Sequence, residues 1–230
     1  MRFMGLLVIF SAMVRVAFCG NDLWLIEQDF VKFGKKEVYE RYKKEMLAGS
    51  SMVAFAAQED DLLQYIYLFP VNDYSGLGDL MQKRADYDQS LSGATLLPYL
   101  STLNFTMRSV LQYLPNCSSI PKGKESLSAY RNIYFYLFGV KPGNETDFEA
   151  RLEKIAAEKA RDMEVCFRSW KIAIGSSVPK YLVAVFAPSE KQAQKRAEAL
   201  EFITLPMKNL LYLQKQGVAV LRKDLSVGGS

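Results

Sequence analysis

Polar side chains inside apolar, strand-like runs are the first candidates for chemistry in this sequence. Glu27 interrupts the apolar run 23–30, and Arg168 interrupts the run 167–174. A carboxylate held against an apolar wall has a raised pKa and can act as a general base. The sequence therefore suggests a cleft in which Glu27 is paired with Arg131 or Arg168.

Aromatic residues in the same runs can form the wall of such a cleft. The candidate ligand-binding set is Trp24, Glu27, Arg131, Tyr134, Tyr136, Arg168 and Trp170. A mainly aromatic wall with a few polar groups favours a small apolar or aromatic ligand. The alternative interpretation is structural: Glu27 and the arginines form an ion pair at a sheet, and the aromatic rings are core.

The composition removes several classes of enzyme. None of the 230 residues is a histidine, which excludes Ser-His-Asp and Cys-His nucleophiles, a His-ligated haem and the usual zinc sites. The three cysteines are too few for a four-thiolate metal site. We therefore expect no metal and no cofactor, and acid–base chemistry is left to carboxylates, Lys, Tyr and Cys.

The charge balance argues against nucleic acid as a partner. The net charge is +4, and it falls to +2 without Arg2 and Arg15 of the N-terminal segment. A nucleic-acid-binding domain carries a one-sided basic field, whereas these basic residues alternate with acidic ones. Mixed charge runs of this kind are typical of solvated helix faces.

The N-terminal segment 1–20 has the features of a secretory signal peptide. A charged start precedes the apolar run 3–14, which is too short to span a bilayer comfortably. No other segment is long and apolar enough to span a membrane. We expect an exported protein, periplasmic or secreted.

The cysteines leave two questions open in an exported protein. Cys19 follows Val16-Ala17-Phe18, which loosely resembles a lipoprotein cleavage box, although Phe18 departs from the small residue required there. Lipid anchoring through Cys19 and conventional cleavage near it are both compatible with this segment. Cys117 and Cys166 either form a disulfide in an oxidising compartment or remain buried thiols.

An internal repeat is the strongest signal in the chain. The pattern VKFGK at 31–35 recurs as VKPGN at 140–144, and the end of the first half at 110–118 matches 218–226. Each half then reads as strand, helix, strand, strand, helix, strand. We predict a first repeat at 21–120, a linker at 121–128 and a second repeat at 129–227.

Two such units are expected to pack sheet against sheet. Trp24, Ile26 and Phe30 point to one side of the first strand, and Leu23 and Leu25 point to the other. Apolar residues on both faces indicate that both faces are covered. The predicted fold class is α+β, with two tandem ferredoxin-like β-α-β-β-α-β units forming an intramolecular α+β barrel.

With these turns and closing strands, the sequence resembles the dimeric α+β barrel superfamily, in particular the antibiotic-biosynthesis-monooxygenase-like proteins. The resemblance covers nearly the whole chain after residue 20, but its motifs indicate a fold rather than a reaction. It implies a range that includes cofactor-free oxygenases, isomerases, haem-degrading enzymes and proteins without known activity. The haem-degrading branch uses a His ligand that this chain lacks.

Two functions remain at this point. The first is an exported, non-catalytic module, monomeric or homodimeric, that binds a small ligand or another protein. The alternative is a cofactor-independent oxygenase or isomerase acting on a small aromatic or apolar molecule. The module predicts filled domain interiors, whereas the enzyme requires an enclosed apolar pocket with converging polar groups.

Overall fold

The computed structural model describes residues 23–47, 52–59, 62–90, 93–120, 130–163, 166–176 and 178–226. The predicted signal peptide (1–20), the lipidation candidate Cys19 and the predicted linker (121–128) lie outside these residues. Among the helices that are described, none has the length and apolar character needed to cross a bilayer.

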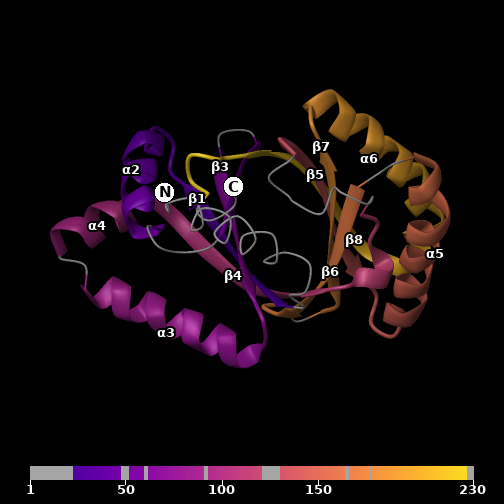
Figure 1. The fold of residues 1–230 in the computed structure, drawn as a ribbon, viewed down its shortest axis with the longest axis horizontal. Helices are drawn as coiled ribbons and strands as arrows, with labels where there is room; N and C mark the ends of the chain where they lie inside the picture. Colours follow the sequence, from indigo (N-terminus) through magenta and orange to yellow (C-terminus); the bar gives the residue numbers. More distant parts are fainter. Residues whose placement is uncertain are drawn as a thin grey trace, which may run out of the picture.

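The order of elements predicted for each half is present in the structure (Figure 1). The first half contains β1 (Leu23–Val31), α2 (Lys36–Leu47), β2 (Val53–Glu59), β3 (Leu62–Val71), α3 (Tyr74–Ser90), α4 (Gly93–Ser101), β4 (Leu103–Tyr113) and the 3-10 helix η2 (Pro115–Cys117). The second half contains β5 (Asn132–Val140), α5 (Glu145–Met163), β6 (Cys166–Ile174), β7 (Lys180–Ala187), α6 (Glu190–Thr204), the 3-10 helix η4 (Leu205–Leu210) and β8 (Leu211–Leu221). The first half differs in having two helices, α3 and α4, where the second has α6 and η4.

The eight strands form one closed antiparallel barrel in the order β1-β3-β2-β8-β5-β7-β6-β4. Each half contributes four neighbouring strands, and the halves meet where β2 pairs with β8 and β4 pairs with β6. Helices α2, α3 and α4 lie outside one sheet, and α5 and α6 lie outside the other (Figure 1). The expected α+β barrel is therefore confirmed as a fold.

The two joints between the halves are short and use the C-terminal parts of β4 and β8. Three residue pairs join β2 to β8 and four join β4 to β6, whereas β1 pairs with β3 over nine. The N-terminal parts of β4 and β8 consequently have a hydrogen-bonded neighbour on one side only. The barrel is thus held together at one end, and its interior is approached from the other.

Alternation along β1 gives both of its faces a buried environment, as predicted. Trp24 and Ile26 belong to the core inside the barrel, and Leu25 and Val31 belong to the core beneath α2 and α4. A third core lies between the second sheet and α5. Successive side chains on a strand point to opposite faces, so one strand serves two cores.

The recurring turn motif makes the same contacts in both halves. Gly34 and Gly143 have φ angles of +72° and +87°, a region that glycine enters without steric cost. The backbone N–H of Lys32 donates to the carbonyl of Thr102, at 2.8 Å, and that of Lys141 donates to Leu210, at 2.9 Å. These bonds fix where β1 and β5 end and their helices begin.

The disulfide alternative for Cys117 and Cys166 is wrong in this structure. Both residues are buried, and neither forms a disulfide. Cys117 packs in the core beside α5, and Cys166 packs inside the barrel. The two sulfurs face opposite sides of the second sheet, so no bond joins them.

Candidate functional site

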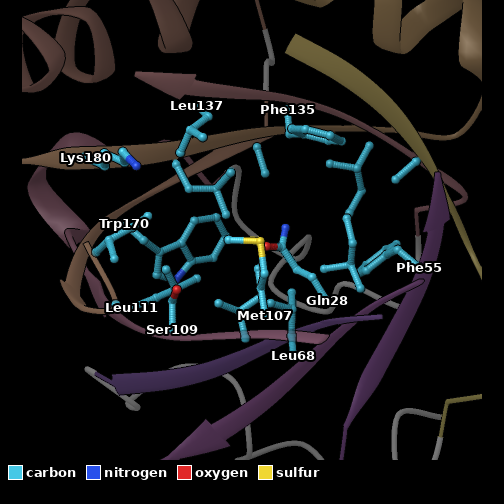
Figure 2. A pocket seen from close by; sticks show the side chains of 18 of the residues that line it. Gln28, Phe55, Leu68, Met107, Ser109, Leu111, Phe135, Leu137, Trp170 and Lys180 are labelled. Atoms are coloured by element: carbon cyan, nitrogen blue, oxygen red, sulfur yellow. The ribbon is translucent and has the colours of Figure 1, made fainter. Parts of the chain in front are cut away.

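An apolar cavity of about 140 Å³ lies inside the barrel, between the two sheets (Figure 2). Its inner wall includes Phe55, Ile133, Trp170, Ala184, Phe186 and Ala219. Its outer part includes Gln28, Met107, Ser109, Leu137, Gly175 and Lys180. An apolar cavity of about 150 Å³ in another protein takes up benzene, so this one has room for a molecule of about one six-membered ring.

Each polar side chain that lines the cavity can donate a hydrogen bond. Gln28 of β1, Ser109 of β4 and Lys180 of β7 are half-buried near the open end. Among the described lining residues none is a carboxylate. The cavity can therefore stabilise an oxygen or a negative charge on a ligand better than it can take up a proton.

Trp170 contributes a large aromatic ring with one N–H donor to the inner wall. It is 1% exposed, and Figure 2 shows its indole reaching from β6 toward Leu111 and Ser109 of β4. Trp24 packs edge-on against it, with ring centroids 6.5 Å apart. Trp24 itself is not among the residues that line the cavity.

Phe135 owes its place in the wall to the glycine opposite it. Gly217 of β8 pairs with Phe135 of β5, and a Cβ atom on Gly217 would lie 2.6 Å from Cζ of that ring. A side chain at position 217 would therefore force the ring to move. The glycine lets the phenyl group lie over the backbone of β8.

A second cluster of functional groups lies on the outer face of the first sheet. Glu27 of β1 accepts a hydrogen bond from Nζ of Lys43 at 2.8 Å, from Nη2 of Arg84 at 2.7 Å and from Nε of Arg108 at 2.7 Å. Burial alone would raise the pKa of Glu27, but the charges of Lys43 and Arg84, with hydrogen bonds from Lys43 and Arg108, hold it well below its usual range. Glu27 is therefore an ionised structural partner, and the expectation of a raised pKa is wrong.

Asp29 is the second carboxylate of this cluster. Its oxygens accept from Tyr39 (2.7 Å), Lys43 (2.7 Å), Tyr99 (3.2 Å) and Thr106 (2.6 Å). Burial raises the pKa of Tyr39, and the neighbouring hydroxyl of Tyr67 and carboxylate of Asp29 raise it further. Every charge in this cluster has a partner of opposite sign, as buried charges require.

The second half has no such cluster at the equivalent place. The positions 109 residues after Glu27, Asp29 and Lys43 are Tyr136, Phe138 and Leu152, and all three are buried in an apolar core. The polar cluster is therefore an asymmetric feature of the first half.

The structure divides the predicted ligand-binding set among several places. Trp24 and Trp170 meet inside the barrel, where Trp170 lines the cavity. Tyr134 and Tyr136 lie against each other on the outer face of the second sheet. Arg131 is exposed, and Arg168 is buried on β6. Glu27 is thus separated from the aromatic wall that the sequence suggested for it.

Gln28, Ser109 and Lys180 are cavity residues outside the ligand-binding set predicted from the sequence. Gln28 could have been found, because it is the polar member of the alternating set that includes Trp24, Ile26 and Phe30. Ser109 and Lys180 carried no signal in sequence, since their role depends on how β4 and β7 close the barrel.

Comparison with known proteins supports the fold and gives a range of activities. No protein-family model matches the chain, and no curated protein matches it. Solved structures do match over nearly the whole chain. A monooxygenase-like protein from Fusobacterium nucleatum has a TM-score of 0.60 at 10% identity, with 89% of this chain and 94% of that chain covered.

Two further neighbours have comparable overlap. An anthrone oxidase-like protein has a TM-score of 0.60 at 10% identity, with 90% of this chain and 94% of that chain covered. A heme-binding protein from Thermus thermophilus has a TM-score of 0.53 at 11% identity, with 87% of this chain and 92% of that chain covered. These names overturn the expectation of a non-catalytic module, and the open cavity contradicts the filled interior that the module predicted.

The residues of the cavity do not fit a haem. The chain has no histidine. Among the described lining residues, only Met107 and Lys180 have a sulfur or nitrogen atom that could approach an iron as a ligand. A cavity of about 140 Å³ matches one ring rather than a porphyrin. Among the described residues, no group of three or more Cys, Asp or Glu is placed to hold a metal ion.

Proposed function

We propose that this chain is an oxygenase-like enzyme that acts, without a bound cofactor, on a small aromatic or similarly apolar molecule inside the barrel. The observation that carries the proposal is the apolar cavity with donor groups but no carboxylate in its described lining. The oxidase and monooxygenase names among proteins of the same fold support the reaction class.

The cavity residues would favour the ionised form of an acidic substrate. Gln28, Ser109 and Lys180 can donate hydrogen bonds to an oxygen that carries negative charge, and apolar walls strengthen such interactions by excluding water. The anion of a hydroquinone or an enolate can transfer an electron to dioxygen, and the substrate radical and superoxide so formed combine to a hydroperoxide, so dioxygen is the oxidant of the step. Because no carboxylate lines the described cavity, we expect substrates that release their proton to solvent at the open end. An isomerase is less well supported, since it would need a base to return the proton.

Oxygen uptake with a size-graded series of substrates tests this function. Single-ring hydroquinones should be consumed with dioxygen uptake and should raise the Tm of the protein, whereas three-ring anthrones should be excluded by the cavity size. Hydroquinones oxidise slowly in air, so the rate without protein is the baseline. The absence of both uptake and thermal stabilisation for every single-ring compound would sink the proposal.

A haem titration distinguishes a cofactor-free oxygenase from a haem-binding protein. We expect no Soret band to develop at stoichiometric haem and no rise in Tm. A saturable Soret band at one haem per chain would favour the haem-binding neighbour over the oxidase-like ones.

We also propose that the two halves arose by tandem duplication. The support is their common strand order and the matching bonds of Lys32 and Lys141, whose ammonium groups donate to Ser101 and Asn209 at 2.9 and 2.8 Å. A related protein made of one unit that dimerises through the same β2–β8 and β4–β6 joints is the expected intermediate. Relatives whose halves cannot be superposed would contradict it.

Export remains a proposal from the sequence. N-terminal sequencing of the native protein should start near residues 19–22, and an intact Met1 would refute cleavage. Mass spectrometry of the same material distinguishes a lipidated Cys19 from conventional processing.

A further inference from the structure

The indole nitrogen of Trp170 is a buried donor without a hydrogen-bond partner among the described residues. Its side chain is 1% exposed and lines the cavity. More than nine in ten buried polar groups in proteins are paired, and an unpaired one destabilises the fold. Such a group in the wall of a ligand-sized cavity calls for a partner that enters from outside.

The surroundings of the indole explain why the protein does not supply that partner itself. The rings of Trp24 and Tyr113 pack against it, at centroid distances of 6.5 and 6.1 Å, and Leu111 and Ile172 lie in the same wall. Figure 2 shows Ser109 on the side toward which the indole extends, but no hydrogen bond joins the hydroxyl to the indole nitrogen. The nitrogen atom is itself buried in this wall, so a ligand oxygen reaches it only when a neighbouring side chain of the wall moves aside.

The equivalent position of the first half shows that the fold does not need this donor. Trp170 lies opposite Leu182 on β7, just as Phe55 lies opposite Ile66 on β3. Phe55 also lines the cavity, and its ring has no polar atom. Equivalent positions of the two halves thus hold an aromatic ring, which carries an N–H group in the second half and none in the first.

We propose that the N–H group of Trp170 is the subsite that receives an acceptor oxygen on the ring of the ligand. This inference rests on the proposed function, because it assumes that the cavity is the ligand site. A site built to hydrogen-bond one ligand oxygen discriminates against an analogue that lacks it. The substrate class is then an oxygenated single ring, such as a phenol or a ring ketone, rather than a hydrocarbon of the same shape.

The chain has only two tryptophans, so its indole N–H groups give two NMR signals that can be assigned by mutation. Trp170→Phe removes one signal, and Trp24→Phe removes the other. Phenol and toluene are the probes, because they have nearly the same size and differ in one oxygen. We expect phenol to shift the Trp170 proton downfield, as hydrogen bonding does, and toluene to leave it nearly unchanged.

Affinities measured on the same proteins complete the test. The preference for phenol over toluene should fall about 3- to 10-fold in Trp170→Phe, as expected for the loss of one neutral hydrogen bond, and should be unchanged in Trp24→Phe. Equal shifts with both probes, together with an unchanged preference, would overturn the subsite and leave the cavity as a binding site. Binding of neither probe would overturn the proposed function and this inference together. Should Trp170→Phe fail to fold, the shifts in the unmodified protein still decide between these outcomes.

Discussion

The ammonium group of Lys43 lies 2.7 Å from the carboxylate of Asp29, with both side chains at most 1% exposed. The corresponding helix and strand of the second half bring together Leu152 and Phe138 instead. The same packing of helix on sheet is therefore achieved with charges in one half and with apolar groups in the other. Replacing a buried ion pair by apolar groups is often neutral or stabilising, whereas breaking it is strongly destabilising.

Removal of Lys43 alone should destabilise the protein severely. In Lys43→Met the carboxylates of Glu27 and Asp29 lose the ammonium that contacts both of them. We expect the free energy of unfolding to fall by about 3–5 kcal/mol, measured by urea denaturation. The matched control is Lys44→Met, because Lys44 makes an ion pair at 3.3 Å with Asp224 in which both groups are nearly half exposed. That change should cost about 0–1 kcal/mol, and equal losses in the two variants would contradict the role given to the buried cluster.

Glu27 should contribute a pH dependence to stability. Folding lowers its pKa below the ordinary value of 4.5, so the unfolded chain takes up the proton first as the pH falls. The stabilisation is present above about pH 4.5 and is lost progressively below it. In Glu27→Gln the slope of unfolding free energy against pH below 4.5 should be shallower, whatever the absolute stability of the variant.

Salt provides the control for that measurement. Asp224 has a pKa lowered to about 2, chiefly by its hydrogen bond with Arg222, but it is nearly half exposed. About 1 M salt screens exposed charges beyond roughly 3 Å and buried ones much less. The part of the pH dependence of unfolding free energy that Glu27→Gln removes should therefore be nearly the same at low and high salt. The part that Asp224→Asn removes should be smaller at high salt. A Glu27 contribution that disappears in salt would mean that its cluster is open to solvent.

The fold was accessible from the sequence because its signals are local. The alternation of Trp24 and Leu25 predicted two buried faces for β1, and the turns at Gly34 and Gly143 marked equivalent points of two halves. Local patterns of this kind depend on period and turn geometry, which act over a few residues.

The candidate site was only partly accessible, because its groups meet through long-range contacts. The prediction from the sequence places Trp24 and Glu27 in one cleft, although a separation of three along a strand puts them on opposite faces. The partners of Glu27 come 16, 57 and 81 residues later in the chain. Nothing in a single sequence fixes such pairings.

Filling the cavity should abolish ligand binding with little effect on the fold. Ala184 of β7 is buried and lines the cavity, so the added carbons of Ala184→Leu enter empty space. Because the carbons enter empty space, we expect a stability loss below the roughly 1–3 kcal/mol typical of overpacking a filled core, and we expect the thermal stabilisation by single-ring ligands to disappear. The control Ala157→Leu lies on an exposed face of α5 and should keep the ligand effect. Unchanged binding in Ala184→Leu would place the ligand elsewhere.

Gly217 should control the cavity through Phe135. In Gly217→Ala the new Cβ would lie 2.6 Å from the ring of Phe135, a separation that real contacts do not reach, so the ring must turn or shift. Because Phe135 lines the cavity, we expect weaker binding of single-ring ligands and a stability loss of about 1–3 kcal/mol, as for overpacked cores. Gly78→Ala is the matched control, since Gly78 lies in α3 with no atom near the added Cβ; alanine there should stabilise the helix by about 0.5–1 kcal/mol and leave binding unchanged. Calorimetric titration of both variants with phenol measures the difference, and equal affinities would show that Phe135 does not shape the ligand site.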